Sequence, residues 1–123
     1  MTDPEGAATD ITRLVDQNGL VKLFANRVRA RILATLLYAD EPLSVARIAD
    51  SAGITRSTTL EALERLERFD VLELEGTGVD ESVDGEIDSQ AFADATFALA
   101  DDDELVETVR RVAELSTKRY YDP

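Results

Sequence analysis

The stretch at residues 43–66, LSVARIADSAGITRSTTLEALERL, constrains the fold more than any other part of the chain. It contains two runs with apolar residues at helical spacing. A short break separates them and contains Gly53, where a turn favours a residue with positive φ. The pattern predicts two helices, at residues 45–51 and about 56–69, joined by a tight turn. This is the arrangement of a helix-turn-helix, whose second helix enters a DNA groove.

Three residues stand where helix caps are expected. Asn26, Ser44 and Thr55 each directly precede a run with helical periodicity. A side-chain oxygen at such a position accepts a hydrogen bond from a backbone N–H of the first turn. We therefore predict helices that begin just after each of these residues.

Flanking patterns complete the outline. Helices are predicted at residues 10–17, 20–25, 27–38 and about 101–119, short strands at 71–74 and 95–99, and a turn at 88–92. Two strands after the second helix would form a wing. The predicted fold is α+β, mainly α: a winged helix-turn-helix with an added C-terminal helix. Its parts are a disordered tail (1–8), a winged-helix DNA-binding domain (9–100) and a C-terminal dimerisation helix with a short tail (101–123).

The composition excludes several kinds of chemistry. The chain has no Cys and no His, which rules out disulfides, Ser-His-Asp and Cys-His catalysis, and most transition-metal sites. No paired carboxylates flank a Gly-rich or apolar pocket motif, so we predict neither enzymatic activity nor an organic cofactor. No apolar run approaches ~18 residues, and the acidic N-terminus lacks the apolar core of a signal peptide. The expected location is the cytoplasm, without membrane contact.

The charge of the chain is strongly acidic. It has 26 Asp and Glu against 13 Lys and Arg, a formal net charge of −13, and its only lysines are Lys22 and Lys118. A dense carboxylate surface stays hydrated at ~1 M salt, where ions screen repulsion within ~3 Å. The acid excess with few lysines resembles proteins of salt-accumulating halophilic archaea. An ordinary acidic mesophilic protein is the alternative.

Longer motifs resemble known families. The run LVKLFANRVRARILATLL at residues 20–37, followed by LSVARIADSAGITRST and LEALERLERFDVLELE, is similar to the opening of ArsR-like winged-helix repressors. A winged helix followed by one C-terminal helix also resembles PadR-type regulators, including haloarchaeal oxidative-stress regulators of the RosR type. The resemblance implies a DNA-binding transcription regulator, a repressor that responds to stress. Metal-sensing relatives use Cys and His pairs, so metal sensing is not carried over.

The candidate DNA contacts lie on the two helices of the helix-turn-helix and at their starts. Arg56 can bond a guanine edge or a phosphate, Leu60 can touch a thymine methyl group, and Glu61 can accept from cytosine. Arg47 is on the helix that crosses the phosphate backbone. Arg65 either reaches a phosphate or pairs with Glu61 at helical spacing. The predicted DNA contacts are Ser44, Arg47, Thr55, Arg56, Ser57, Thr58, Leu60, Glu61 and Arg65.

Apolar residues near both ends of the chain predict a homodimer. In the last helix they repeat at spacings of three and four, as in a helix that packs on a partner helix. The first helix can join this contact. The predicted interface residues are Ile11, Leu14, Val15, Leu105, Val109 and Val112.

The predicted wing is unusually acidic, since residues 69–109 contain fourteen acids and no Lys or Arg. Such a wing either stays off DNA or approaches it through cations held between carboxylates and phosphates. Candidate neighbours of a bound K⁺ are Glu73, Glu75 and Asp80, and Na⁺ and Cl⁻ are the other ions expected. Plain solvated surface is the alternative.

The sequence therefore predicts a homodimeric, sequence-specific transcription regulator of a halophilic archaeon. It would bind a pseudo-palindromic site in double-stranded DNA at high salt. The alternative is a winged-helix module that binds a protein partner in transcription or replication.

Overall fold

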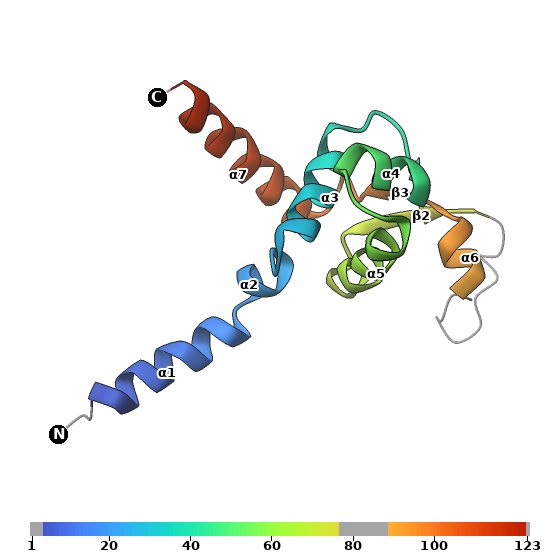
Figure 1. The fold of residues 1–123 in the computed structure, drawn as a ribbon. Coiled ribbons are helices and arrows are strands. Elements are labelled where there is room, and N and C mark those ends of the chain that lie inside the picture. The colour runs from blue at the N-terminus through green and yellow to red at the C-terminus, as the bar shows by residue number, and fades with distance from the viewer. Residues whose placement is uncertain (1–3, 77–88, 123) are drawn as a thin grey trace.

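The computed structural model describes residues 4–76 and 89–122. Its helices are α1 (Pro4–Gln17), α2 (Gly19–Leu23), α3 (Arg27–Tyr38), α4 (Val45–Ala52), α5 (Arg56–Leu66), α6 (Ser89–Asp94) and α7 (Glu104–Tyr121), with a 3-10 turn η1 (Glu67–Phe69) after α5. Its strands are β1 (Leu43–Ser44), β2 (Leu72–Glu75) and β3 (Thr96–Leu99). In Figure 1, α3, α4 and α5 gather beside the strands, whereas α1 and α7 extend away from this body toward the same side.

The predicted caps of α3, α4 and α5 are confirmed. Backbone N–H groups donate to Asn26 Oδ1 (3.0 Å, from Arg29), Ser44 Oγ (3.3 Å, from Arg47) and Thr55 Oγ1 (3.3 Å, from Thr58). Gly53 ends α4 in the left-handed region, with φ 73, which a residue without Cβ adopts at little cost. Local sequence signals thus position both helices of the helix-turn-helix.

The three strands form one antiparallel sheet in the order β1-β3-β2. Phe97 lies on the central strand, opposite Leu43 on one side and Leu74 on the other. The sequence did not predict β1, because two residues before a helix carry no recognisable strand pattern. This short strand nevertheless ties the start of α4 to the sheet.

The core lies between the helices α3–α5 and the sheet. Ile32, Ile48, Leu63, Leu66 and Phe97 have no exposed surface and come from α3, α4, α5 and β3. Burying side chains of this size stabilises the fold by roughly 1.5–3 kcal/mol each. The inward face of α5 carries Thr59, Ala62, Leu63 and Leu66.

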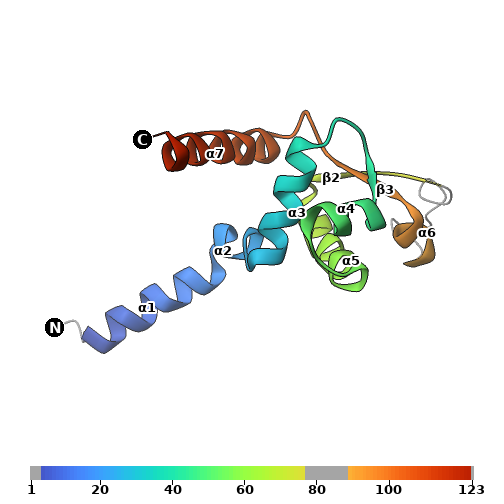
Figure 2. The same cartoon turned by 45° about the horizontal axis from the view of Figure 1, so that its top comes forward.

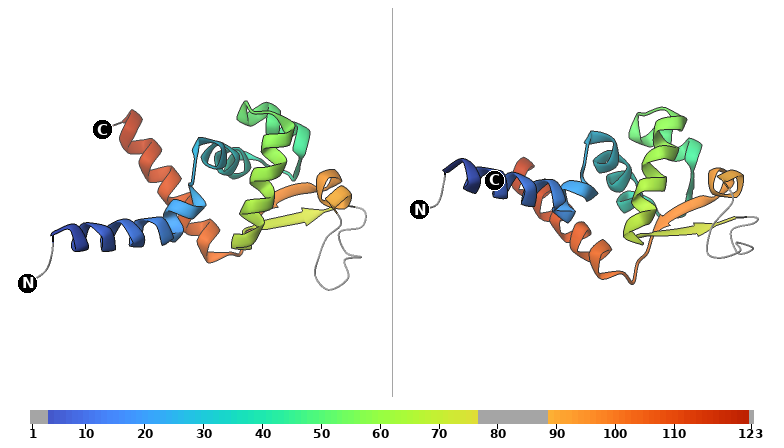
Figure 3. Two further views of the ribbon diagram at one scale, coloured as in Figure 1. Left: turned by 60° about the horizontal axis from the view of Figure 1, so that its bottom comes forward. Right: turned by 90° about the horizontal axis from the view of Figure 1, so that it is seen from below.

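This architecture is a winged helix-turn-helix, as predicted. The turned views show β2 and β3 side by side and α5 packed beside them (Figures 2 and 3). The wing's connecting segment falls largely at residues 77–88, outside the described residues, and α6 follows it.

The predicted disordered tail at residues 1–8 is wrong from Pro4 onward, because α1 begins there. Proline is favourable in the first turn of a helix, and the residues that follow include good helix formers. From Asp10 to Gln17, α1 is exposed along its whole length. No helix among the described residues combines the length and the apolar character that crossing a bilayer requires.

Two further boundaries differ from the prediction. The turn predicted at residues 88–92 is replaced from Ser89 by helix α6, because Phe92 packs edge-on against Phe97 with ring centroids 5.1 Å apart. The final helix begins at Glu104 instead of near residue 101. Asp103 caps it by accepting from the N–H groups of Leu105 and Val106.

Candidate nucleic-acid interface

The start of α5 presents a cluster of polar donors. Arg56, Ser57 and Thr58 are exposed, whereas Thr59, one residue on, is fully buried. Thr55 Oγ1 donates to Thr58 Oγ1 at 2.8 Å and lies 3.4 Å from Ser57 Oγ. Hydroxyl groups gathered at a helix N-terminus, together with its free N–H groups and dipole, favour an anionic partner.

Arg56 differs from the other arginines of the helix-turn-helix in having no carboxylate partner. Among residues 4–76 and 89–122, Arg47 pairs with Glu41 at 3.1 Å and Arg65 with Glu61 at 3.0 Å, but no ion pair involves Arg56. All four paired groups are largely exposed, and such surface pairs are worth only about 0–1 kcal/mol. The arrangement leaves Arg56 ready to bind an anion and lets the paired arginines exchange partners at little cost.

The middle of α5 offers less to a groove. Leu60, the predicted thymine contact, is half-buried and packs against the core. Glu61 is exposed, but its carboxylate already accepts from Arg65, the ion pair that helical spacing predicted. The free donors of this helix therefore gather in its first turn.

The first helix of the pair contributes fewer groups. Ser44 is half-exposed at the start of α4, and its hydroxyl caps the helix while keeping a proton to donate. Arg47 is exposed one turn later. The predicted contacts Ser44, Arg47 and Thr55–Thr58 thus lie at the starts of α4 and α5.

Two buried polar atoms near these helices lack a hydrogen-bond partner in the described part of the chain, namely Arg29 Nε and Glu67 Oε2. Burial raises the pKa of Glu67, and the nearby charge of Asp70 raises it further. Arg29 donates to the backbone carbonyl of Lys22 and ties α2 to α3.

Arg31 makes a contact that the sequence did not reveal. Its Nε donates to the carbonyl of Ala52 at 2.5 Å, next to the Gly53 turn. Arg29 and Arg31 of α3 thus both bind backbone carbonyls, contacts that periodicity does not reveal.

The acidic character of the wing is visible on β2. Glu73 and Glu75 are exposed and, two residues apart on a strand, share one face of the sheet. The third predicted neighbour of a cation, Asp80, lies outside the described residues. Within the described residues, no group of three or more acidic side chains has the spacing of a metal site.

The predicted dimer residues fall into two classes. Ile11, Leu14 and Val15 on α1 are 63%, 66% and 50% exposed, and Val112 on α7 is 55% exposed. Val109, by contrast, is only 9% exposed and belongs to the core of its own chain. Val106 of the same helix is also in this core and was not among the predicted interface residues. Leu105 is 37% exposed. The apolar surface that is free for a partner is therefore mostly on α1 and on the outer side of α7.

Comparison with known proteins agrees with this architecture. Residues 29–76 match the IclR helix-turn-helix domain. A solved structure with the same fold is the homodimeric winged helix-turn-helix DNA-binding domain, fragment 1–100, of a possible ArsR-family transcriptional regulator from Mycobacterium bovis. The two are 21% identical, with a TM-score of 0.53, over 100% of this chain and 96% of the other. No curated protein matches the sequence. The chain is thus a winged helix-turn-helix protein whose helix-turn-helix segment is similar to that of the IclR type.

Proposed function

We propose that this protein is a sequence-specific DNA-binding transcription regulator. The observation that carries the proposal is the first turn of α5, where Arg56, without an ion-pair partner among the described residues, and the hydroxyls of Ser57 and Thr58 face solvent from a helix whose other side is buried. In a winged helix-turn-helix this turn enters the major groove, where arginine and hydroxyl groups read base edges. The IclR-type match and the DNA-binding neighbour support the same role.

The protein acts as a homodimer in this proposal. The exposed apolar side chains of α1 and of Val112 need a partner surface, and the Mycobacterium bovis neighbour is homodimeric. Two copies related by a two-fold axis would present their α5 helices to two half-sites about one DNA turn apart. The operator is then a pseudo-palindrome, and binding over a promoter makes the protein a repressor, as the ArsR-like resemblance implies.

The charge of the chain further supports a halophilic archaeal source and a cytoplasmic site of action. Binding at molar salt would rest on hydrogen bonds and shape more than on counterion release, and K⁺ held near Glu73, Glu75 and Asp80 would bridge the acidic wing to phosphates. A stress signal as inducer belongs to the same proposal through its RosR-type resemblance.

The test is selection of DNA fragments from a haloarchaeal genome by the purified protein in molar KCl. Recovery of one enriched, two-fold symmetric motif is expected, and fluorescence anisotropy should then give a far weaker affinity for a scrambled site. If the folded protein enriches no motif, or binds an enriched motif and its scrambled version equally, the proposal fails and the protein-interaction module becomes the better explanation.

A further inference from the structure

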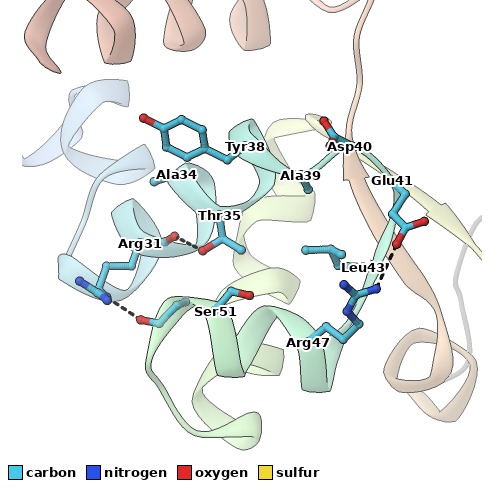
Figure 4. Close-up of a pocket in the computed structure, with 11 residues that line it drawn as sticks. Arg31, Ala34, Thr35, Tyr38, Ala39, Asp40, Glu41, Leu43, Arg47 and Ser51 are labelled. Carbon is cyan, nitrogen blue, oxygen red and sulfur yellow. Dashed lines mark hydrogen bonds and ion pairs between the residues drawn. The ribbon is translucent and has the colours of Figure 1, made fainter. Parts of the chain in front are cut away.

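A hollow of about 750 Å³ opens between α3 and α4, and of the proposed DNA contacts Arg47 lines it. Its floor is made of small residues, including Ala34, Thr35 and Ala52, which is why space remains between the two helices. Figure 4 shows its two ends: Arg31 lies at one end, and Asp40 and Glu41 at the other. A volume of this size lies within the ~300–1,000 Å³ of small-molecule sites.

The Arg31 end of the hollow suits an anion. Within the described residues, the Arg31 guanidinium donates only through Nε, to the Ala52 carbonyl, so both terminal nitrogens remain available there. In the part of the chain that the structure describes, no carboxylate pairs with Arg31, although acids outnumber bases two to one. Ser51 lines the hollow from α4. A guanidinium with a hydroxyl nearby is a common pair of donors for phosphate.

The opposite end suits a ring with hydrogen-bond donors. The Tyr38 side chain is 80% exposed at the rim of the hollow, which leaves an aromatic face in water. Asp40 follows it closely, and its carboxylate accepts hydrogen bonds from amino or hydroxyl groups while repelling an anion. Arg31 and Tyr38 are seven residues apart on α3, about 10 Å along a helix that rises 1.5 Å per residue. That span suits a ligand with an anion at one end and a ring at the other.

We propose that the hollow between α3 and α4 binds a nucleoside monophosphate. The phosphate binds Arg31 and Ser51, the base stacks on Tyr38, and Asp40 accepts from a hydroxyl or amino group of the nucleoside. At the far end Asp40 and Glu41 disfavour a phosphate, and the Arg47 guanidinium there is already paired with Glu41 at 3.1 Å, so the phosphate is attracted more strongly to the Arg31 end.

Occupancy would be coupled to the start of α5. The Arg31–Ala52 contact holds the end of α4 directly before Gly53, and the turn at Gly53 sets the position of Thr55 and Arg56. A phosphate bound to Arg31 either competes with the Ala52 carbonyl for the guanidinium or strengthens the hydrogen bond between Arg31 Nε and that carbonyl. Either change shifts the turn at Gly53. This coupling rests on the proposed DNA-binding function, whereas nucleotide binding does not.

Binding is tested on the protein alone, without DNA. Titration of the ¹⁵N-labelled chain with AMP should shift the amide signals of Thr35, Ser51 and Ala52 and leave those of α7 unchanged. Adenosine, which lacks the phosphate, and inorganic phosphate, which lacks the base, should each bind on the order of tenfold more weakly. Tyr38→Ala and Arg31→Gln should weaken AMP binding to a similar degree.

Two matched controls separate the site from general surface effects. Tyr120→Ala removes a tyrosine that is 79% exposed on α7, and Arg119→Gln removes an exposed arginine of the same helix. Both should leave AMP binding unchanged. The Tyr38 side chain is 80% exposed, so its variant remains informative even if Arg31→Gln disturbs the turn.

Several results would overturn the inference. Equal affinity for phosphate and AMP would show that the hollow is a simple anion site. Amide shifts centred elsewhere in the chain would show that AMP does not bind in the hollow. If AMP fails to bind while Tyr38→Ala weakens DNA binding, the hollow belongs to the DNA surface. If AMP binds but leaves DNA affinity unchanged, the coupling is refuted. Absence of DNA binding alone would refute the proposed function and leave the nucleotide result intact.

Discussion

The arginines of the helix-turn-helix differ in what they must give up to reach DNA. Arg47 and Arg65 each release a carboxylate, whereas Arg56 has no such partner in the part of the chain that the structure describes. Arg56→Ala should therefore cost the most, about 1–3 kcal/mol if the guanidinium reads a base edge, and it should relax preference at that base. Anisotropy titrations on a panel of single-base operator variants measure both effects.

Arg65→Ala serves as the comparison on the same helix. Because its loss also frees Glu61, a smaller and sequence-independent change is expected. Equal weakening by Arg56→Ala on every operator variant would instead make Arg56 a phosphate contact. No change on any variant would remove the start of α5 from the interface.

Glu67 carries a pH-dependent cost to stability. Its pKa is raised by burial and by Asp70, so its stabilising contribution is complete below the unfolded pKa and is lost as pH rises through the folded one. At neutral pH the charged carboxylate is unfavourable, and its Oε2 lies buried without a partner in the described residues. Glu67→Gln should raise the urea midpoint near pH 7, and the gain should vanish near pH 4.

The control for Glu67 is Glu64→Gln, since Glu64 is exposed on the adjoining turn of α5. It removes the same charge without relieving burial and should change stability little at either pH. A Glu67→Gln gain that persists undiminished in acid would show that the side chain acts through packing, not through its charge.

At the scale of elements, α7 contributes to the core of its own chain through one valine and to the proposed dimer interface through another. Val109 is buried in the chain's own core, and Val112 is exposed one turn later. Val109→Asp should destabilise the fold by about 3–5 kcal/mol, since it buries an unpaired charge. Val112→Asp should leave the fold intact but produce monomers. Circular dichroism reports whether each variant is folded, and light scattering reports whether it is a monomer or a dimer.

Leu14→Asp extends this test to α1, whose apolar side chains Ile11, Leu14 and Val15 are at least half exposed in the monomer. It too should yield folded monomers. A wild-type protein that is already monomeric at micromolar concentration would contradict the dimer proposal.

The sequence predicts those elements whose signals are local. The caps Asn26, Ser44 and Thr55, the Gly53 turn and the inward face of α5 all follow from residue type and helical spacing. Elements stabilised by tertiary contacts were missed or misassigned. The strand β1 forms only because Leu43 finds Phe97 across the sheet, and α6 is held by Phe92 on the same ring.

The candidate site shows the same division. Exposure of Arg56, Ser57 and Thr58 and the pair of Glu61 with Arg65 follow from position on a helix. The Arg31–Ala52 contact joins residues 21 positions apart, and the burial of Val109 depends on where α7 crosses the body. Neither depends on spacing within one element, so neither is visible in the sequence pattern.

At the scale of the whole molecule, charge dominates. Ordinary counterion release reduces affinity ~10³–10⁵-fold between ~50 and ~200 mM salt for proteins with several phosphate contacts. Here the net charge is −13, and screening at molar salt weakens repulsion between the acidic surface and DNA. Operator affinity should therefore fall only weakly, or rise, from moderate to molar KCl.

The triple variant Glu73→Gln, Glu75→Gln and Asp80→Asn tests whether cations at the wing produce this response. It should make affinity fall more steeply with KCl, as for an ordinary basic protein. Matched substitutions of Asp16, Glu107 and Glu114, exposed acids of α1 and α7, should not make affinity fall more steeply. A steep loss of wild-type affinity that the wing variant leaves unchanged would refute cation bridging.

The central position of β3 also bears on how the chain is made. Both edge strands pair only with β3, which comes last of the three in sequence, and its Phe97 fills the middle of the core. During synthesis the helices α3–α5 can form from local contacts, but the sheet cannot close until residue 99 has left the ribosome. Until then, the apolar side of α5 has no sheet to cover it. A nascent chain arrested before residue 96 should therefore bind chaperones and yield to protease, and one extended past α7 should resist both.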